Sequence, residues 1–85
     1  MNIQLRFFAG IRETLGTAQE RLDLPAHVQT VGEVRDFLRE RGGPWAEALA
    51  EGRALRMAYN QEMTDAATQL TDGCEVAFFP PVTGG

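Results

Sequence analysis

The chain has 85 residues, one cysteine and a formal net charge of −4, which is enough for one domain with a modest core. One cysteine excludes an internal disulfide and a four-cysteine metal site, the acidic balance argues against nucleic-acid binding, and no apolar run approaches the roughly 20 residues of a membrane span. With no recognisable signal peptide and no disulfide, the protein is expected to be cytoplasmic.

The first half of the chain predicts two strands and then the main helix. Residues 3–8 alternate between apolar and polar side chains, as strands do, and a short helical segment ending at Gly16 follows. A second strand is expected over residues 18–24. Thr30 and Glu33 have the spacing of a capping box, which predicts a helix beginning at Thr30 with an apolar stripe along one side.

The second half predicts a short helix and two further strands. Residues 44–52 open with a proline, which suits a first helical turn, and place Trp45 against the core. Strands are expected over residues 55–60 and 74–79, with a turn over residues 60–65 between them. This order of elements indicates an α+β domain, in which a mixed sheet has one main helix packed on one face.

Two phenylalanines are predicted on the sheet face that the helix leaves uncovered. Successive side chains of a strand point to opposite faces, so Phe7 faces the helix and Phe8 faces away from it. In the last strand Phe78 likewise points inward and Phe79 outward. If these strands are neighbours, Phe8 and Phe79 form an exposed apolar patch, and such patches often mark interfaces.

The last six residues are suited to entering a narrow site. Pro80 and Pro81 fix an extended backbone, and the next two residues, Val82 and Thr83, are β-branched and also favour extension. The final residues, Gly84 and Gly85, have no side chains. We therefore expect a folded domain over residues 1–79 and an extended tail over residues 80–85.

The tail would present the α-carboxylate of Gly85 as its one reactive group. A carboxylate is a poor acyl donor, but adenylation activates it, and sulfur can then displace AMP to leave a thiocarboxylate. The chain itself has no glycine-rich phosphate-binding motif. Activation would therefore require a partner enzyme.

Four stretches of the sequence resemble the family of molybdopterin synthase small subunits, also called molybdopterin converting factor subunit 1, which are ubiquitin-like sulfur carriers. The most specific is the ending, "FFPPVTGG". The others are "RFFAGIRETLG" near the start, "YNQEMTD" in the predicted turn and "LTDGCEVAFFPP" leading into the last strand. Together they cover nearly the whole chain.

The resemblance implies a β-grasp fold, with the first and last strands parallel at the centre of the sheet. It also implies a reaction cycle. An adenylyltransferase related to ubiquitin-activating enzymes would use ATP to adenylate Gly85, and a sulfur donor enzyme would supply the sulfur. The thiocarboxylate would then donate sulfur to cyclic pyranopterin monophosphate, forming the molybdopterin dithiolene.

The resemblance also implies roles for individual residues of this chain, each matched by its position in the shared motifs. Gly85 matches the sulfur-bearing glycine and Gly84 the glycine before it, while Phe8, Met63 and Phe79 match apolar positions that dock on the large subunit of the synthase. Pro80, Pro81, Val82 and Thr83 would enter that subunit with the tail. Two small subunits would serve a dimer of large ones, a heterotetramer. The chain would bind no cofactor or metal and would be non-catalytic on its own.

Three alternatives remain open at this point. The chain could carry sulfur for another pathway, such as thiamine synthesis or tRNA thiolation, it could be a ubiquitin-like protein modifier, or it could be a plain interaction domain. The sequence contains no lysine, which excludes modifier chains built on itself but not attachment to other targets. Cys74 stands where the family commonly has an acid, and we expect it to be a structural thiol.

Overall fold

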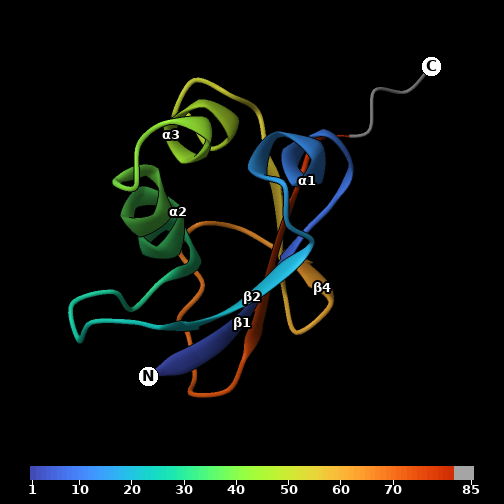
Figure 1. Cartoon of the computed structure of the whole chain (residues 1–85). Helices are drawn as coiled ribbons and strands as arrows, with labels where there is room; N and C mark the ends of the chain where they lie inside the picture. Colours follow the sequence, from blue (N-terminus) through green and yellow to red (C-terminus); the bar gives the residue numbers. More distant parts are fainter. Residues whose placement is uncertain (82–85) are drawn as a thin grey trace.

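The computed structural model describes residues 1–81 of the protein. A five-stranded sheet crosses the molecule, and three helices pack against one of its faces (Figure 1). The elements, in chain order, are β1 (Asn2–Phe7), α1 (Ala9–Leu15), β2 (Gln19–Asp23), α2 (Val31–Arg39), α3 (Pro44–Ala48), β3 (Arg56–Tyr59), β4 (Glu62–Thr64) and β5 (Glu75–Phe79). Within residues 1–81, none of the helices has the length and apolar character that crossing a bilayer requires.

The strands are ordered β2-β1-β5-β3-β4 across the sheet. The first and last strands of the chain, β1 and β5, are parallel neighbours at its centre, and every other pairing is antiparallel. This is the β-grasp arrangement that the resemblance implied. It places the end of β5, where the predicted tail begins, at the opposite end of the sheet from the N-terminus (Figure 1).

The core forms between the helices and one face of the sheet, as the alternation of strand side chains predicted. Phe7 and Phe78 are no more than 1% exposed, and their stacked rings lie 6.4 Å apart between centroids. Trp45 meets Phe7 edge-to-face at 5.6 Å, which confirms its predicted packing role. Cys74 is buried in the same core, where a structural thiol is expected to lie.

The structure differs from the predicted boundaries in two places, the end of β1 and the segment after β3. β1 ends at Phe7 rather than Phe8, because Ala9 adopts a φ of 51° and turns the chain into α1. Met63 was expected in a turn but lies in β4. Asn60 and Gln61 have φ of 47° and 70°, the positive values of a tight hairpin turn, so the returning strand begins immediately after them.

The tail is described only at its start. Pro80 is half-buried and Pro81 is exposed, and neither lies in a helix or strand. The remaining predicted tail residues lie outside the described residues: Val82, Thr83, Gly84 and Gly85.

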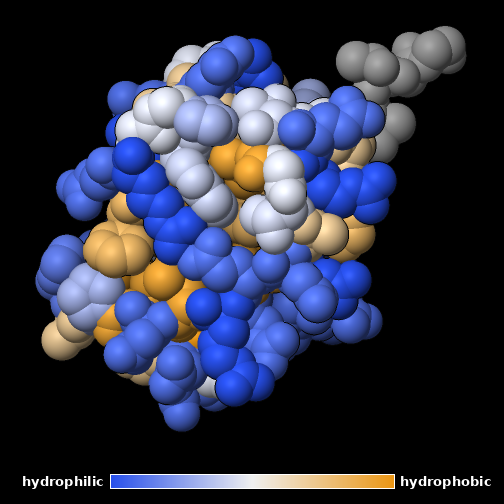
Figure 2. All heavy atoms as spheres, viewed as in Figure 1, coloured by the Kyte–Doolittle hydropathy of each residue, from blue (hydrophilic) through white to orange (hydrophobic). Residues whose placement is uncertain are grey.

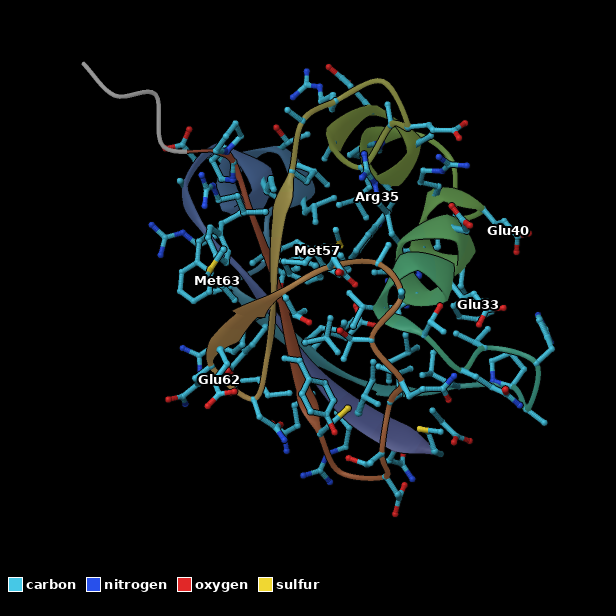
Figure 3. The ribbon with its side chains drawn as sticks, turned by 180° about the vertical axis from the view of Figure 1, so that it is seen from behind. Glu33, Arg35, Glu40, Met57, Glu62 and Met63 are labelled. Atoms are coloured by element: carbon cyan, nitrogen blue, oxygen red, sulfur yellow. The ribbon has the colours of Figure 1, made fainter. Side chains whose placement is uncertain are left out.

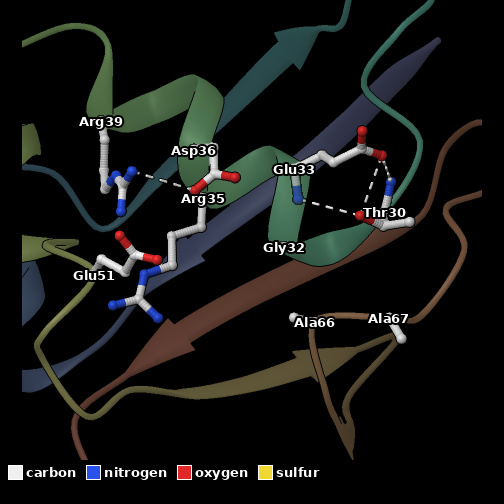
Figure 4. Close-up of a pocket in the computed structure, with 9 residues that line it drawn as sticks. All are labelled: Thr30, Gly32, Glu33, Arg35, Asp36, Arg39, Glu51, Ala66 and Ala67. Atoms are coloured by element: carbon white, nitrogen blue, oxygen red, sulfur yellow. Dashed lines mark hydrogen bonds and ion pairs between the residues drawn. The ribbon is translucent and has the colours of Figure 1, made fainter.

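The capping box at the start of α2 is confirmed. The Thr30 hydroxyl accepts a hydrogen bond from the Glu33 backbone N–H at 3.2 Å, and the Glu33 carboxylate accepts one from the Thr30 backbone N–H at 3.1 Å. The next two backbone donors, Val31 N–H and Gly32 N–H, reach the carbonyl oxygens of Thr68 at 3.0 Å and Ala66 at 2.9 Å. The loop after β4 therefore crosses directly over the first turn of α2 (Figure 4).

This crossing leaves no room for a side chain at Gly32. A Cβ there would lie 2.8 Å from the Ala66 Cβ and 3.1 Å from its carbonyl oxygen. We expect Gly32→Ala to lower the free energy of unfolding by about 1–3 kcal/mol, the usual cost of overpacking, measured by equilibrium urea denaturation. The matched control is Gly10→Ala in α1, where a Cβ meets nothing within 4 Å, and it should stabilise the fold by about 0.5–1 kcal/mol. Equal responses of the two variants would contradict this close approach.

Candidate functional site

The predicted aromatic pair lies where β1 and β5 end. The parallel register pairs Phe7 with Phe78, so the residues that follow them, Phe8 and Phe79, are also side by side. Their rings meet edge-to-face with centroids 6.0 Å apart. Phe8 is 40% exposed and Phe79 is half-buried. The prediction that the two phenylalanines are neighbours on the uncovered face is therefore confirmed.

Met63 extends this apolar surface across the sheet. In the β-sheet register Met63 pairs with Ala58, and Ala58 pairs with Ala77. Met63 is 55% exposed, whereas the alanines are 6% and 5% exposed although they lie on the uncovered face. Figure 3 shows Met63 pointing away from the helices, while Met57 on the adjacent strand β3 points toward them.

This surface is called the open-face patch below, and it comprises Phe8, Ala58, Met63, Ala77 and Phe79. Among the described residues, the large hydrophobic side chains classed as exposed are Met1, Phe8 and Met63, so two of the three belong to the patch. On the side of the molecule drawn in Figure 2, by contrast, most of the surface is hydrophilic and the visible apolar atoms form small separate groups. An exposed apolar surface of this kind is typical of a docking site.

The hairpin that carries Met63 is fixed to β5 by an asparagine. The Asn60 side-chain oxygen accepts a hydrogen bond from the Glu75 N–H at 2.9 Å, and the Asn60 N–H donates to the Glu75 carbonyl oxygen at 2.9 Å. Asparagine also tolerates the positive φ of this turn better than most residues. Asn60 therefore helps to place Met63 relative to Phe79, a role that the sequence did not reveal.

Two arginines flank the ring pair. The Arg6 guanidinium carbon lies 5.8 Å from the centroid of the Phe8 ring, and one of its nitrogens is 3.9 Å from a Glu75 carboxylate oxygen. Arg56 stands directly opposite Phe79 in the register of β3 and β5 and is exposed. Alternation along β1 puts Arg6 on the same face as Phe8, whereas the position of Arg56 beside Phe79 follows only from the pairing of β3 with β5.

A concave surface lies along the outer side of α2, away from the open-face patch, and is lined by Thr30, Gly32, Glu33, Arg35, Asp36, Arg39, Glu51, Ala66 and Ala67 (Figure 4). Most of its charged groups make contacts within the fold, and Glu33 belongs to the capping box. Arg39 pairs with Asp36 at 3.5 Å, and Arg35 donates to the carbonyl oxygens of Leu49 and Arg53, each at 2.9 Å. Partial burial lowers the pKa of Arg35, and the positive charge of Arg39 lowers it further. These contacts hold α2 against the chain that follows α3, so we assign the groove a structural role.

Within residues 1–81 there is no group of three or more His, Cys, Asp or Glu side chains arranged to hold a metal ion. Cys74 is buried in the loop directly before β5, whereas His27 is exposed in the loop between β2 and α2. The site that remains is the open-face patch together with the start of the tail at Pro80 and Pro81. The other predicted site residues, from Val82 to Gly85, lie outside the described residues.

Comparison with known sequences gives two findings. The sequence profile of the ThiS family matches residues 5–85. The molybdopterin synthase sulfur carrier subunit of Escherichia coli (strain K12) is 43% identical to this chain over 83 residues, which cover 98% of this chain and 99% of that protein.

Comparison with solved structures gives the same fold. SAMP1 from Haloferax volcanii superposes with a TM-score of 0.76 at 26% identity, over 100% of both chains. A protein–protein complex of subunits 1 and 2 of molybdopterin-converting factor from Helicobacter pylori 26695 contains a chain that superposes with a TM-score of 0.66 at 28% identity, again over 100% of both chains.

Proposed function

This chain belongs to the ThiS family, and we propose that it is a sulfur carrier that serves as the small subunit of a molybdopterin synthase. The relative at 43% identity has this function in its name, and the aligned region spans nearly all of both proteins. The structural relative from Helicobacter pylori is a complex of two subunits. We infer that this chain likewise works with a large subunit, in a heterotetramer of two small and two large subunits.

The observation that carries the proposal is the position of the Phe8–Phe79 pair. Because β1 and β5 are parallel neighbours, the two rings and the start of the tail lie at the same end of the sheet. A partner that covers the rings would therefore also receive the residues that follow Pro80 and Pro81. The open-face patch would dock the carrier, and the tail would reach into the partner's active site.

The chemistry of the carrier would reside in its last two residues. Gly85 would bear the activated carboxyl group, and Gly84 would let a narrow channel close around the backbone. The six residues from Pro80 to Gly85 can reach at most about 20 Å when extended. The sequence has no glycine-rich phosphate-binding motif, so an adenylyltransferase related to ubiquitin-activating enzymes would supply the ATP chemistry, and a sulfur donor enzyme would supply the sulfur.

In this scheme the thiocarboxylate on Gly85 passes its sulfur to cyclic pyranopterin monophosphate within the large subunit, which builds the molybdopterin dithiolene. Once its sulfur is bonded to the substrate, water would hydrolyse the C–S bond to the Gly85 carbonyl, so the carrier returns to a plain carboxylate and can be charged again. These steps belong in the cytoplasm, where the reducing environment keeps a thiocarboxylate and the single cysteine from being oxidised to disulfides.

Intact-mass measurement tests the proposal directly. After co-expression with the activating enzyme and a sulfur source, we expect the protein to gain roughly 16 Da, from exchange of one oxygen for sulfur. Fragmentation should place the gain on Gly85. Oxidation of any of the three methionines adds a similar mass, so the control is protein expressed without the activating enzyme, which must not gain mass at Gly85. A gain confined to methionine would contradict the sulfur-carrier function.

The same experiment separates the alternatives. A protein modifier would yield adducts in which Gly85 is joined by isopeptide bonds to lysines of other proteins, rather than a free thiocarboxylate. A carrier for another thiolation pathway would gain the sulfur but would not restore molybdopterin synthesis when mixed with the large subunit and cyclic pyranopterin monophosphate. We expect both the sulfur gain and the restored synthesis.

A further inference from the structure

The charges on the open face of the sheet differ from those of the molecule as a whole. The chain has 12 acidic and 8 basic residues, yet the strand positions on the open face carry three arginines and two carboxylates. The arginines are Arg6, Arg21 and Arg56, and the carboxylates are Asp23 and Glu75. At its strand positions, the open face therefore carries more positive than negative charge, although the protein as a whole is acidic.

Both carboxylates on this face already have cationic neighbours. Asp23 lies 3.9 Å from the N-terminal ammonium group, and Glu75 lies 3.9 Å from Arg6. Arg56 forms no ion pair with any of residues 1–81 and is exposed. Its guanidinium group is therefore accessible to a carboxylate of a partner.

Arg6 and Arg56 stand on either side of the ring pair. Arg6 lies over Phe8, and Arg56 is the cross-strand neighbour of Phe79, with side chains about 5 Å apart at Cβ. Charges at the rim of an apolar contact steer association and reject partners with like charges in the same place. An apolar patch between two cations is best matched by an apolar hollow that has acidic residues at its edges.

We propose that Arg6 and Arg56 determine partner specificity by pairing with carboxylates that border the hollow into which Phe8 and Phe79 dock. The inference rests on the proposed function, and the partner that it concerns is the large subunit of molybdopterin synthase from the same organism. Arg56 has the larger part, because Glu75 already offsets the charge of Arg6.

The test measures association kinetics with that large subunit for wild type and for Arg56→Glu, at low and at high ionic strength. Reversing a rim charge mainly changes the association rate and its salt dependence, so we expect Arg56→Glu to associate about tenfold more slowly at low salt. At about 1 M salt, where the screening length is about 3 Å, the difference should largely disappear. Arg56→Lys keeps the charge and should associate like wild type.

The matched control is Arg53→Glu, which makes the same charge change at an exposed position outside the strands. If Arg53→Glu slows association as much as Arg56→Glu, only net charge matters and the inference is overturned. Faster association of Arg56→Glu would also overturn it, since the partner would then have a basic rim. If wild type binds the large subunit tightly and every variant associates at the same rate, this inference is wrong but the proposed function stands. If wild type does not bind the large subunit at all, the proposed function is wrong as well.

Discussion

Adding one permanent serine after Gly85 is expected to abolish sulfur transfer and leave the fold unchanged. The proposed function requires the reacting carboxyl group to sit at the tip of the tail, at a fixed distance from the docked domain. One residue moves that group by about 3.4 Å, and a displacement of 1 Å can already cost about 100-fold in rate. The measurement is the yield of thiocarboxylate by intact mass, together with molybdopterin synthesis in a reconstituted assay.

Deletion of Gly85 is the complementary variant, because it shortens the tail by the same amount and still leaves a terminal glycine. It should be as inactive as the extended variant, and both should unfold at the same urea concentration as wild type, since Gly85 follows the last strand by several residues. Both should also bind the large subunit through the open-face patch. Normal cofactor synthesis by either variant would refute the assignment of the reactive group to Gly85.

Replacement of Phe8 by aspartate should weaken binding to the large subunit by about 2 kcal/mol or more, roughly 30-fold in affinity. The change removes an exposed aromatic ring from the centre of the proposed interface and leaves a charge that docking would strip of water. Affinity can be measured by calorimetry with the isolated large subunit.

We expect this substitution to have only a small effect on folding. Phe8 is the N-cap residue of α1, its backbone is extended with φ −128° and ψ 155°, and its side chain makes no capping hydrogen bond. Aspartate is among the favoured N-cap residues, so stability should be kept within about 1 kcal/mol of wild type. Phe8→Ser caps without a charge and should bind with intermediate affinity. Unchanged affinity of Phe8→Asp in a folded protein would remove Phe8 from the interface.

Sequence patterns predicted the parts of the fold that local physics determines. The capping box of Thr30 and Glu33 located the start of α2, and the alternation of Phe7 with Phe8 assigned their faces correctly. The neighbouring positions of Phe8 and Phe79 depend on the pairing of β1 with β5, which are separated by most of the chain. Local patterns hold no information about such a pairing, and it was the family resemblance that supplied it.

The structure shows two features of the site that the sequence analysis missed. β4 has three residues, too few for an alternating pattern, and its hairpin turn uses Asn60 and Gln61 in place of the common Asn-Gly. Arg56 became part of the site only through its register with Phe79. For β4 the sequence lacked a recognisable strand and turn pattern, and for Arg56 it lacked the identity of the paired strand.

The strand order also affects how readily the protein could aggregate through its sheet while Phe8 and Phe79 are not covered by a partner. The two outermost strands are β2 and β4, and an outermost strand is where a second copy would add its own strand. β4 offers only three residues, and β2 carries Glu20, Arg21 and Asp23 among its five. Such short or charged borders give poor templates for growth of the sheet from one molecule to the next. We therefore expect the carrier not to polymerise through its sheet borders while the open-face patch is exposed between encounters.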